Sequence, residues 1–293
     1  MKKEKINKIK KKKSLKKNIK RILFSSLIGI PLSYFGYCFC TPQFDCDPNY
    51  KVPLKRPQEF LDKYSYQKRN IEAKVQEQVE NNRFNIKKVS FTSSCSYLDD
   101  NRVTFDYYTI NKDNNKSTIL ICPISEGVTP IEKLFANYLA LNKFNCAIIH
   151  NQKYKNQSND PQEIERFLKQ SIVDNREVMD YISQQSPSHT QSFGILGISL
   201  GAIKATLTSG IDSRIKCCVL IMGGGSMADV MSYSNEPGEI KRRKKFLEYC
   251  SLQEYHDSIM NNVLSDPLIV APYIDATNTL MYVAQSDSTV PYF

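Results

Sequence analysis

Residues 193–209 read FGILGISLGAIKATLTS, and this segment carries the strongest indication of the fold. Residues 193–198 are apolar or glycine, which is typical of a buried strand, and the residues after Ser199 have the composition of a short helix. Between the two, residues 197–201 form the pattern G-x-S-x-G. A sharp turn at this point lifts the Ser199 hydroxyl above the edge of the sheet, and a side chain at either glycine would collide with a neighbouring strand or helix. We predict that Ser199 is a nucleophile, and that the Leu200 N–H, at the positive end of the helix, points at the group it attacks.

Short β-rich runs alternate with amphipathic stretches on both sides of this turn, from about residue 87 onward. Such alternation predicts an α/β fold with a mostly parallel central sheet flanked by helices. The predicted strands are Lys87–Cys95, Arg102–Ile110, Ser117–Cys122, Phe144–His150, Phe193–Ile198, Ile215–Met222 and Thr279–Ala284. The first two are expected to pair as a hairpin, and the last is the seventh.

Two helices are predicted to begin after Thr129 and Asp160, because each is followed by proline and then by glutamate at the third position, which completes a helix cap. An apolar stripe on the first of these helices is expected to pack on the sheet. Its members are Ile131, Leu134, Phe135, Tyr138 and Leu139. Residues 226–276 interrupt the alternation and are expected to form a cap-like insertion within a domain that spans 87–293.

The amino-terminal part differs from the rest in charge. Residues 1–21 carry 12 basic residues and one acid, which leaves 28 basic and 29 acidic residues in the remaining 272. The net charge of +10 therefore belongs to this tail. We expect no nucleic-acid partner, with binding through residues 1–21 as the alternative. The uncharged stretch 22–40 spans about 28 Å as a helix and suits a membrane anchor with the domain facing outward. A cleaved export signal and a basic tail on a cytoplasmic protein are the alternatives. Residues 41–86 are expected to be a proline-rich connector and then a surface helix over 58–82.

Composition excludes several classes of protein. An apolar content of 41%, with 14 Phe and 17 Tyr, supports a core and excludes a mostly disordered chain or a multi-span membrane protein. Nine cysteines are present, but no Cys-x-x-Cys pair or Cys/His ligand spacing occurs. We therefore expect no structural zinc site, and nucleophilic chemistry at Ser199 requires neither a metal ion nor an organic cofactor.

The order of strands and helices, together with the turn at Ser199, resembles the α/β-hydrolase family over about residues 87–293. Segments 197–201, 212–216, 222–225 and 287–291 resemble its esterase-like members related to dienelactone hydrolases. The resemblance implies a serine hydrolase that acts on small carboxylic esters through an acyl-serine intermediate. Peptidases and thioesterases use the same machinery and are alternatives, as is a relative without activity that binds a ligand.

The resemblance also implies the acid that assists Ser199. In this family the acid follows the seventh core strand as D-x-x-V-P, which is Asp287 in this chain. Some members place it after the sixth strand, where this chain has Asp229. A carboxylate is required because the imidazole that takes the serine proton becomes a cation and must be oriented.

A second oxyanion donor comes, in the family, from the loop after the third strand. The resemblance implies that the N–H of Ile124 or of Ser125 joins that of Leu200 in this role. Glu126, in the same loop, is unusual beside a site that holds negative charge.

The catalytic histidine is missing from its family position, because none of the six residues after Asp287 is a histidine. The chain has His150 at a predicted strand end, His189 in a Ser/Pro loop and His256 in the insertion. Three explanations follow. The chain is a product truncated after the seventh strand, a disabled relative that binds ligands, or an enzyme that uses His256 as the base in a rearranged site.

Overall fold

The computed structural model describes residues 54–80, 83–110, 117–152, 160–185 and 192–290. One eight-stranded sheet, in the order β1-β2-β3-β5-β4-β6-β7-β8, runs through this part of the chain. Its strands are β1 Lys74–Glu80, β2 Phe84–Thr92, β3 Arg102–Ile110, β4 Thr118–Cys122, β5 Asn145–Ile149, β6 Phe193–Ile198, β7 Ile215–Ile221 and β8 Thr279–Tyr282. The neighbours β1–β2, β2–β3 and β3–β5 are antiparallel. The neighbours β5–β4, β4–β6, β6–β7 and β7–β8 are parallel. The hairpin predicted for the first two predicted strands is confirmed as β2 and β3. The mostly parallel sheet is confirmed as well.

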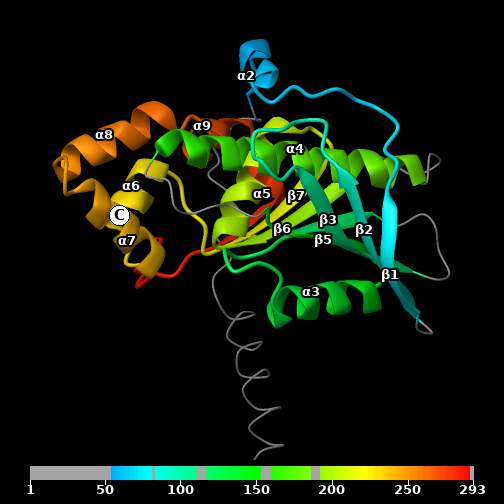
Figure 1. The fold of residues 1–293 in the computed structure, drawn as a ribbon. Coiled ribbons are helices and arrows are strands. Elements are labelled where there is room, and N and C mark those ends of the chain that lie inside the picture. The colour runs from blue at the N-terminus through cyan, green and yellow to red at the C-terminus, as the bar shows by residue number, and fades with distance from the viewer. Residues whose placement is uncertain (1–53, 81–82, 111–116, 153–159, 186–191, 291–293) are drawn as a thin grey trace, which may run out of the picture. The chain divides into compact units, whose positions relative to one another are not determined.

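Helices cover both faces of this sheet, α3 on one face and α4 and α5 on the other (Figure 1). The helices of the described residues are α2 Gln58–Asp62, α3 Pro130–Leu141, α4 Pro161–Gln185, α5 Leu200–Ile211, α6 Met227–Tyr233, α7 Pro237–Phe246, α8 Leu252–Asn262 and α9 Pro267–Val270. Two short 3₁₀ helices, η1 Ala271–Tyr273 and η2 Ala276–Asn278, lead into β8. The predicted α/β fold is confirmed.

The core forms two layers because alternate residues of a strand point to opposite faces. In β6, Ile195 is 1% exposed and packs with α4 and α5, whereas Leu196 is 6% exposed and packs on the side of α3. In β5, Ala147 and Ile148 divide in the same way. A strand buried on both faces reads as a continuous apolar run, which is why these strands were recognisable in the sequence.

The predicted surface helix over 58–82 is wrong beyond its first turn. Helix α2 ends at Asp62, and residues 74–80 form β1, which pairs antiparallel with β2. Ile71, Val75 and Val79 are four residues apart, and a spacing of four fits one turn of a helix as well as two repeats of a strand. The free edge of β2 decides between the two, because it offers hydrogen-bond partners to an extended chain. The sheet therefore begins at Lys74 rather than Lys87.

The apolar stripe predicted for α3 packs on the sheet only in part. The row that faces the sheet is Glu132, Ala136 and Ala140, all buried. Phe135 and Leu139 flank this row, partly buried against the core. The other three members of the predicted stripe are exposed, by 51% at Ile131, 68% at Leu134 and 61% at Tyr138. The small alanines let the helix approach the sheet closely, and the hydrogen bonds of Glu132 described below fix the rotation of the helix.

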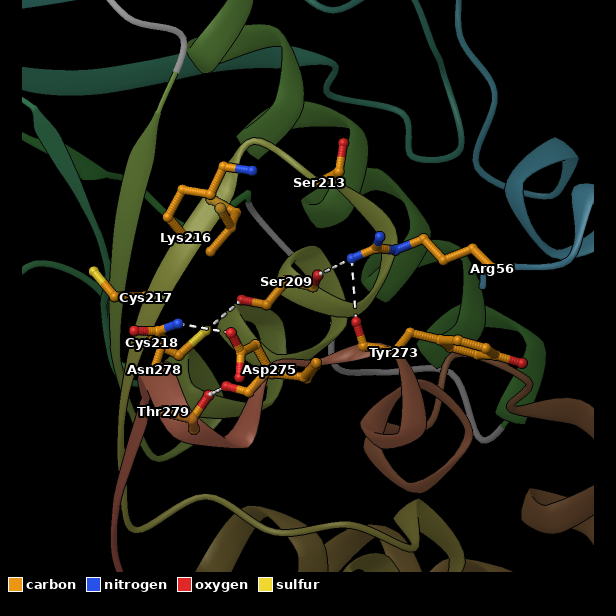
Figure 2. A pocket seen from close by; sticks show the side chains of 12 residues that line it. Arg56, Ser209, Ser213, Lys216, Cys217, Cys218, Tyr273, Asp275, Asn278 and Thr279 are labelled. Carbon is orange, nitrogen blue, oxygen red and sulfur yellow. Dashed lines mark hydrogen bonds between the residues drawn. The ribbon is translucent and has the colours of Figure 1, made fainter. Parts of the chain in front are cut away.

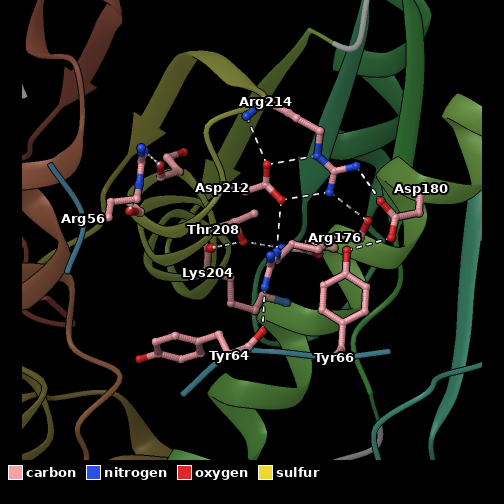
Figure 3. Close-up of polar contacts among 12 residues, drawn as sticks. Arg56, Tyr64, Tyr66, Arg176, Asp180, Lys204, Thr208, Asp212 and Arg214 are labelled. Carbon is pink, nitrogen blue, oxygen red and sulfur yellow. Dashed lines mark hydrogen bonds and ion pairs between the residues drawn. The ribbon is translucent and has the colours of Figure 1, made fainter. Parts of the chain in front are cut away.

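A cluster of charged side chains joins α4 and α5 to the segment that precedes the sheet (Figure 3). Asp212, at the end of α5, accepts hydrogen bonds from Arg176 Nε at 3.0 Å and Arg214 Nη2 at 2.8 Å. Asp180 of α4 binds Arg214 in turn and accepts a hydrogen bond from the Tyr66 hydroxyl at 2.7 Å. Burial would raise the pKa of Asp212, but the hydrogen bonds and charges of Arg214 and Arg176 lower it to about 2. The ionised carboxylate thus fixes the far end of α5.

A polar cavity of about 360 Å³ lies beside the amino-terminal end of β7 (Figure 2). The Arg56 guanidinium lines it and donates to the carbonyls of Gly210 at 2.6 Å, Ser209 at 3.1 Å and Tyr273 at 3.2 Å. The bonds to Gly210 and Ser209 satisfy carbonyls at the last turn of α5, which have no partner inside the helix. Ser199 lies at the other end of the strands, so this cavity is separate from the turn at Ser199.

The insertion predicted over 226–276 contains α6 to α9 and lies mostly at one end of the sheet (Figure 1). Within the ranges that the structure describes, no helix has the length and apolar character that a bilayer crossing needs. The stretch 22–40, for which an anchor or signal is predicted, lies outside those ranges.

Candidate active site

Ser199 occupies the turn between β6 and α5 with a backbone that serine rarely adopts, φ 52° and ψ −120°. The surrounding main chain holds it there. Its N–H donates to the carbonyl of Ile221 in β7 at 2.8 Å, and its carbonyl accepts from Ala202 N at 2.8 Å and Ile203 N at 3.2 Å. The side chain is half-buried. The turn predicted from the sequence is present, with Ser199 reachable from outside.

Both glycines of the pattern are required by close packing of the main chain. A Cβ on Gly197 would lie 2.2 Å from the carbonyl oxygen of Gly201, and one on Gly201 would lie 2.0 Å from that of Cys122. Real Cβ atoms do not approach backbone oxygen so closely. These close approaches hold α5 against β4 and β6 and so fix the turn that carries Ser199.

Ser199 opens onto a cavity of about 550 Å³ between the carboxyl ends of the strands and the insertion. Its apolar wall comes from α4, α5 and α6, namely Ile164, Phe167, Leu168, Ile203, Met227, Val230 and Met231. Its polar lining includes Ser125, Glu126, Asn151, Gln152, Glu236, Glu239, Arg242 and Thr289. On α7, Arg242 Nη1 donates to both carboxylate oxygens of Glu239, at 2.8 and 2.7 Å. The cavity therefore offers apolar contact to one part of a ligand and polar contact to another.

The loop after β4 brings Ser125, but not Ile124, to this cavity together with Ser199 and Leu200. The N–H of Ile124 already donates to Glu132 Oε1 at 3.3 Å. Of the two N–H groups that the resemblance offered as second oxyanion donor, the geometry favours that of Ser125. Glu126, also at the cavity, accepts a hydrogen bond from the Ser125 hydroxyl at 3.0 Å.

Glu132, predicted from the sequence only as part of a helix cap, also belongs to the site. It is fully buried, and its Oε2 accepts the N–H of Thr129 at 2.7 Å as well as the Thr129 hydroxyl. Burial alone would raise its pKa, but the hydrogen bonds from Thr129 and Ile124 hold the pKa below its usual value. The capping box predicted at Thr129 is confirmed, and its glutamate also ties down the loop that carries Ser125.

Asp287 lies in the loop after β8, and this loop reaches the cavity. Asp287 Oδ1 accepts the N–H groups of Thr289 at 2.8 Å and Val290 at 3.0 Å, and both of those residues line the cavity. The carbonyl of Ser288 accepts the N–H of Asn235 at 2.7 Å, which ties the loop to the insertion. The carboxyl group is half-buried and held by its own turn, and Asp287 itself is not among the residues that line the cavity.

The structure brings together Asp229 and His256, which the sequence offered as alternative acid and possible base. His256 Nε2 lies 3.0 Å from Asp229 Oδ1. The hydrogen bond from Ser226 and a smaller contribution from His256 lower the pKa of Asp229. However, Met227, Val230 and Met231 are the residues of α6 that line the cavity. Asp229 lies about 200° around the helix from Met227, on the other side. Neither member of the pair lines the cavity at Ser199.

The other two histidines are not found at the cavity either. His150, after β5, has its Nε2 3.2 Å from Asp106 Oδ2, and His189 lies outside the described residues. In the part of the chain that the structure describes, no histidine lines the cavity at Ser199. The same residues contain no group of three or more His, Cys, Asp or Glu side chains that could hold a metal ion.

Two more residues behind the cavity were not singled out in the sequence. Asn151, the second residue after β5, lines the cavity, and the buried Lys204 on α5 donates to its side chain. A polar residue at the carboxyl end of a buried parallel strand is a signal that would have indicated Asn151. For Lys204 the signal was weaker, a lone charge in an otherwise apolar helix.

Comparisons with known proteins agree on the fold. No protein-family model matches the chain, and no curated protein matches it. Among solved structures it is similar to an acetyl xylan esterase from Paenibacillus sp. R4, with a TM-score of 0.59, 17% identity, and coverage of 80% of this chain and 86% of that one. It is similar also to acetyl xylan esterase 1 from Thermoanaerobacterium sp. JW/SL YS485, with a TM-score of 0.60, 15% identity, and coverage of 82% and 83%. The chain therefore has the α/β-hydrolase fold, and the resemblance drawn from the sequence is confirmed at that level.

Proposed function

We propose that this chain is a serine hydrolase of carboxylic esters, with Ser199 as the nucleophile. The observation that carries the proposal is the strained backbone of Ser199, φ 52° at the mouth of a cavity. A residue held in so unfavourable a conformation persists only when the surrounding structure enforces it, and such residues concentrate at active sites. The esterase names of the two similar structures agree with this proposal but share little sequence with the chain.

In the proposed reaction, Ser199 Oγ attacks the ester carbonyl carbon and its proton passes to a base. The carbonyl oxygen becomes an oxyanion that the N–H groups of Leu200 and Ser125 stabilise. The alcohol then leaves with a proton, and water hydrolyses the acyl-serine to release the acid and regenerate the hydroxyl. The apolar wall of α4 and α6 suits an acyl group or an apolar alcohol. Asp287 is proposed as the acid because its loop reaches the cavity, with Asp229 as the alternative.

The base determines how fast this reaction runs. With no histidine lining the cavity among the described residues, we expect Ser199 to be acylated by activated esters and turnover to be slow. Triads that lose the histidine keep only a residual rate, roughly 10³–10⁴-fold over water, from the oxyanion donors and binding. Fast turnover would instead require His256 to reach Ser199 from the insertion.

The same observation favours a second candidate function. A chain of this fold with a nucleophile turn but no base at the cavity can bind an ester or acid without cleaving it. The two candidates differ in whether a covalent bond to Ser199 forms.

A fluorophosphonate probe tests the proposal, because this strong electrophile phosphonylates a nucleophilic serine whose reaction the oxyanion donors assist. We expect labelling of the full chain, loss of labelling in Ser199→Ala, and a burst of p-nitrophenol from p-nitrophenyl butyrate followed by a slow steady rate. His256→Ala tests whether His256 acts as the base. A steady rate equal to that of the wild type excludes His256 from this role. Labelling that persists in Ser199→Ala, or no labelling of the wild-type chain, overturns the proposal, and the latter result favours the binding protein. Cleavage of thioesters or peptides with no cleavage of esters would favour the related activities.

A further inference from the structure

A buried lysine lies on α5, the helix that begins directly after the proposed nucleophile. Lys204 is on α5, five residues after Ser199, and is only 4% exposed. Its Nζ donates a hydrogen bond to Asn151 Oδ1 and lies 6.0 Å from the centre of the Phe167 ring. Burial lowers the pKa of Lys204. An ammonium group is costly to bury, so its place in the packing of α5 requires a reason beyond filling space.

Asn151 connects this lysine to the loop that carries Ser125. Its Nδ2 donates to the carbonyl of Ile124 at 2.6 Å and is 3.4 Å from that of Ser125. Asn151 is placed for this because it follows β5, the parallel neighbour of β4, and both strands end at the same edge of the sheet. The carbonyl of Ile124 also accepts the N–H of Gly127 at 3.0 Å, which closes the loop into a turn.

The lysine decides which way the amide of Asn151 points. An ammonium group has hydrogen-bond donors and no acceptor. Lys204 therefore requires Oδ1 of Asn151 on its own side, which leaves the NH₂ group directed at the loop carbonyls. Without Lys204 the amide loses the contact that distinguishes its two ends.

Fixing the Ile124 carbonyl also fixes the next N–H. The C=O of Ile124 and the N–H of Ser125 belong to one planar trans peptide, in which the two bonds point in opposite directions. A carbonyl held toward Asn151 thus aims the Ser125 N–H away from Asn151. On the other side of the loop, Glu132 holds the preceding peptide through the Ile124 N–H at 3.3 Å.

We propose that Lys204 and Asn151 are positioning residues that hold the Ser125 N–H as the second oxyanion donor. This inference rests on the proposed function of Ser199. Because Lys204 and Ser199 are on the same helix, the link also fixes the loop relative to the nucleophile. Neither residue needs to touch the substrate's reacting atoms.

The test measures the second-order rate of fluorophosphonate labelling and the burst rate with p-nitrophenyl butyrate, both on the full chain. Asn151→Ala and Lys204→Met are each expected to lower these rates about 10- to 100-fold, somewhat less than the roughly 10²–10³-fold loss from deleting an oxyanion donor. The concentration of ester at half-maximal burst rate should stay within about twofold of wild type, because both variants leave the apolar wall from α4, α5 and α6 unchanged. The two residues act in series, so the double variant should be no slower than Asn151→Ala.

Two further variants separate positioning from stability. Thr208 is on α5, as Lys204 is, and accepts a buried hydrogen bond from Asn175 Nδ2 of α4 at 2.8 Å. Thr208→Val removes this bond and should lower the melting temperature without changing the labelling rate. Asn151→Asp keeps the contact with Lys204 but cannot donate to the Ile124 carbonyl. It should be slow even if Lys204→Met does not fold.

The outcomes divide cleanly. A wild-type chain that does not react overturns the proposed function and this inference with it. A reactive wild type with an equally reactive Asn151→Ala or Asn151→Asp overturns the inference alone. Additive losses in the double variant, or a Lys204→Met that loses melting temperature but no rate, would show that Lys204 is structural and not a positioning residue.

Discussion

Ser199 is held in a conformation that opposes stability. Non-glycine residues in sparsely populated backbone regions cost on the order of 1–3 kcal/mol, and the packing around the turn offsets this cost. Glycine would adopt φ 52° without strain, although it loses more conformational freedom on folding than alanine does. We therefore predict that Ser199→Gly is more stable than Ser199→Ala by about 1 kcal/mol, measured by urea denaturation.

Ser183 provides the matched control for this prediction, because it lies within α4. There the order should reverse, with Ser183→Gly less stable than Ser183→Ala by roughly 1 kcal/mol, as is usual within a helix. If Ser199→Gly is the less stable of its pair as well, the turn is not strained.

Gly201 is constrained by space. An alanine there would place its Cβ 2.0 Å from the carbonyl of Cys122, so α5 would have to move away from β4. We predict that Gly201→Ala lowers the free energy of unfolding by about 3 kcal/mol or more and abolishes fluorophosphonate labelling. Gly127→Ala is the comparison, since its added Cβ meets no atom within 4 Å and only its φ of 94° is unfavourable. Equal losses in the two variants would contradict the packing argument.

The residues of the candidate site differ in how visible they are in a sequence. Ser199 and its glycines form a local pattern, so turn and chemistry were both predictable. Asn151 and Lys204 act through each other across 53 positions of the chain, and no local spacing reveals such a contact. Asp229 and His256 were proposed separately as acid and base, and only the packing of α6 against α8 shows that they meet on the side of α6 away from the cavity.

At the scale of elements, the loop between β4 and α3 depends on an ionised Glu132. Its folded-state pKa lies below the usual value, so the carboxylate stabilises the fold above the pKa of the unfolded chain, about 4.5, and this contribution is lost as the pH falls through the folded value. We predict that wild type is more stable than Glu132→Gln at pH 7, by about 1–3 kcal/mol. The gap should narrow as the pH falls below 4.5 and through the lower pKa of the folded chain. Denaturation curves of the two chains from pH 3 to 8 test this, and a constant gap would contradict it.

Helix α4 contains a group with the opposite behaviour. Asp174 is 3% exposed, with Oδ2 accepting from Gln152 at 2.8 Å and Oδ1 from Gln170 at 2.7 Å. Burial raises its pKa to about 7, and the hydrogen bonds offset this only in part. The folded chain keeps the proton of Asp174 to higher pH than the unfolded chain does, so protonation of Asp174 stabilises the fold. This contribution is complete below about pH 4 and is lost as the pH rises through 7.

Asp174→Asn removes this titration. We predict that, relative to the wild type, the variant becomes more stable as the pH rises from 4 to 8, by up to about 4 kcal/mol. The difference in free energy of unfolding between the two chains, followed over that range, is the measurement. A difference that does not change with pH would show that Asp174 is ionised throughout.

The elements themselves were predictable where two independent signals agreed. Helix α4 has a cap, a proline in its first turn and a long apolar period, and it was predicted nearly to its ends. For β1 the only signal was a four-residue spacing, which a helix and a strand share, and pairing with β2 decided the outcome. On α3 the apolar stripe was correct as a pattern but wrong as a contact surface, because the alanines and Glu132 determine which side meets the sheet.

At the scale of the whole molecule, the exchange of β4 and β5 in the sheet order brings the ends of β4 and β6 together at the cavity. The alternation of strands and helices predicted a parallel sheet but not this order, since order depends on where each crossover helix packs. Helix α3 contacts β3 and β5 on its face, while α4 and α5 occupy the other face. The outer strands of the sheet consequently have less cover than its centre.

Strand β8 shows the consequence of that arrangement. It pairs only with β7 among the described residues, and Leu280, Met281 and Tyr282 are 50%, 51% and 46% exposed. An apolar edge strand with free backbone groups is a template for pairing with another chain, and a charge on the edge opposes such pairing. We predict that Met281→Lys lowers self-association of the full chain several-fold, measured by light scattering over a concentration series. Met260→Lys is the matched control, because Met260 is 57% exposed on helix α8, away from any strand edge. Equal effects of the two lysines would show that loss of exposed apolar surface, and not the edge of β8, governs the association.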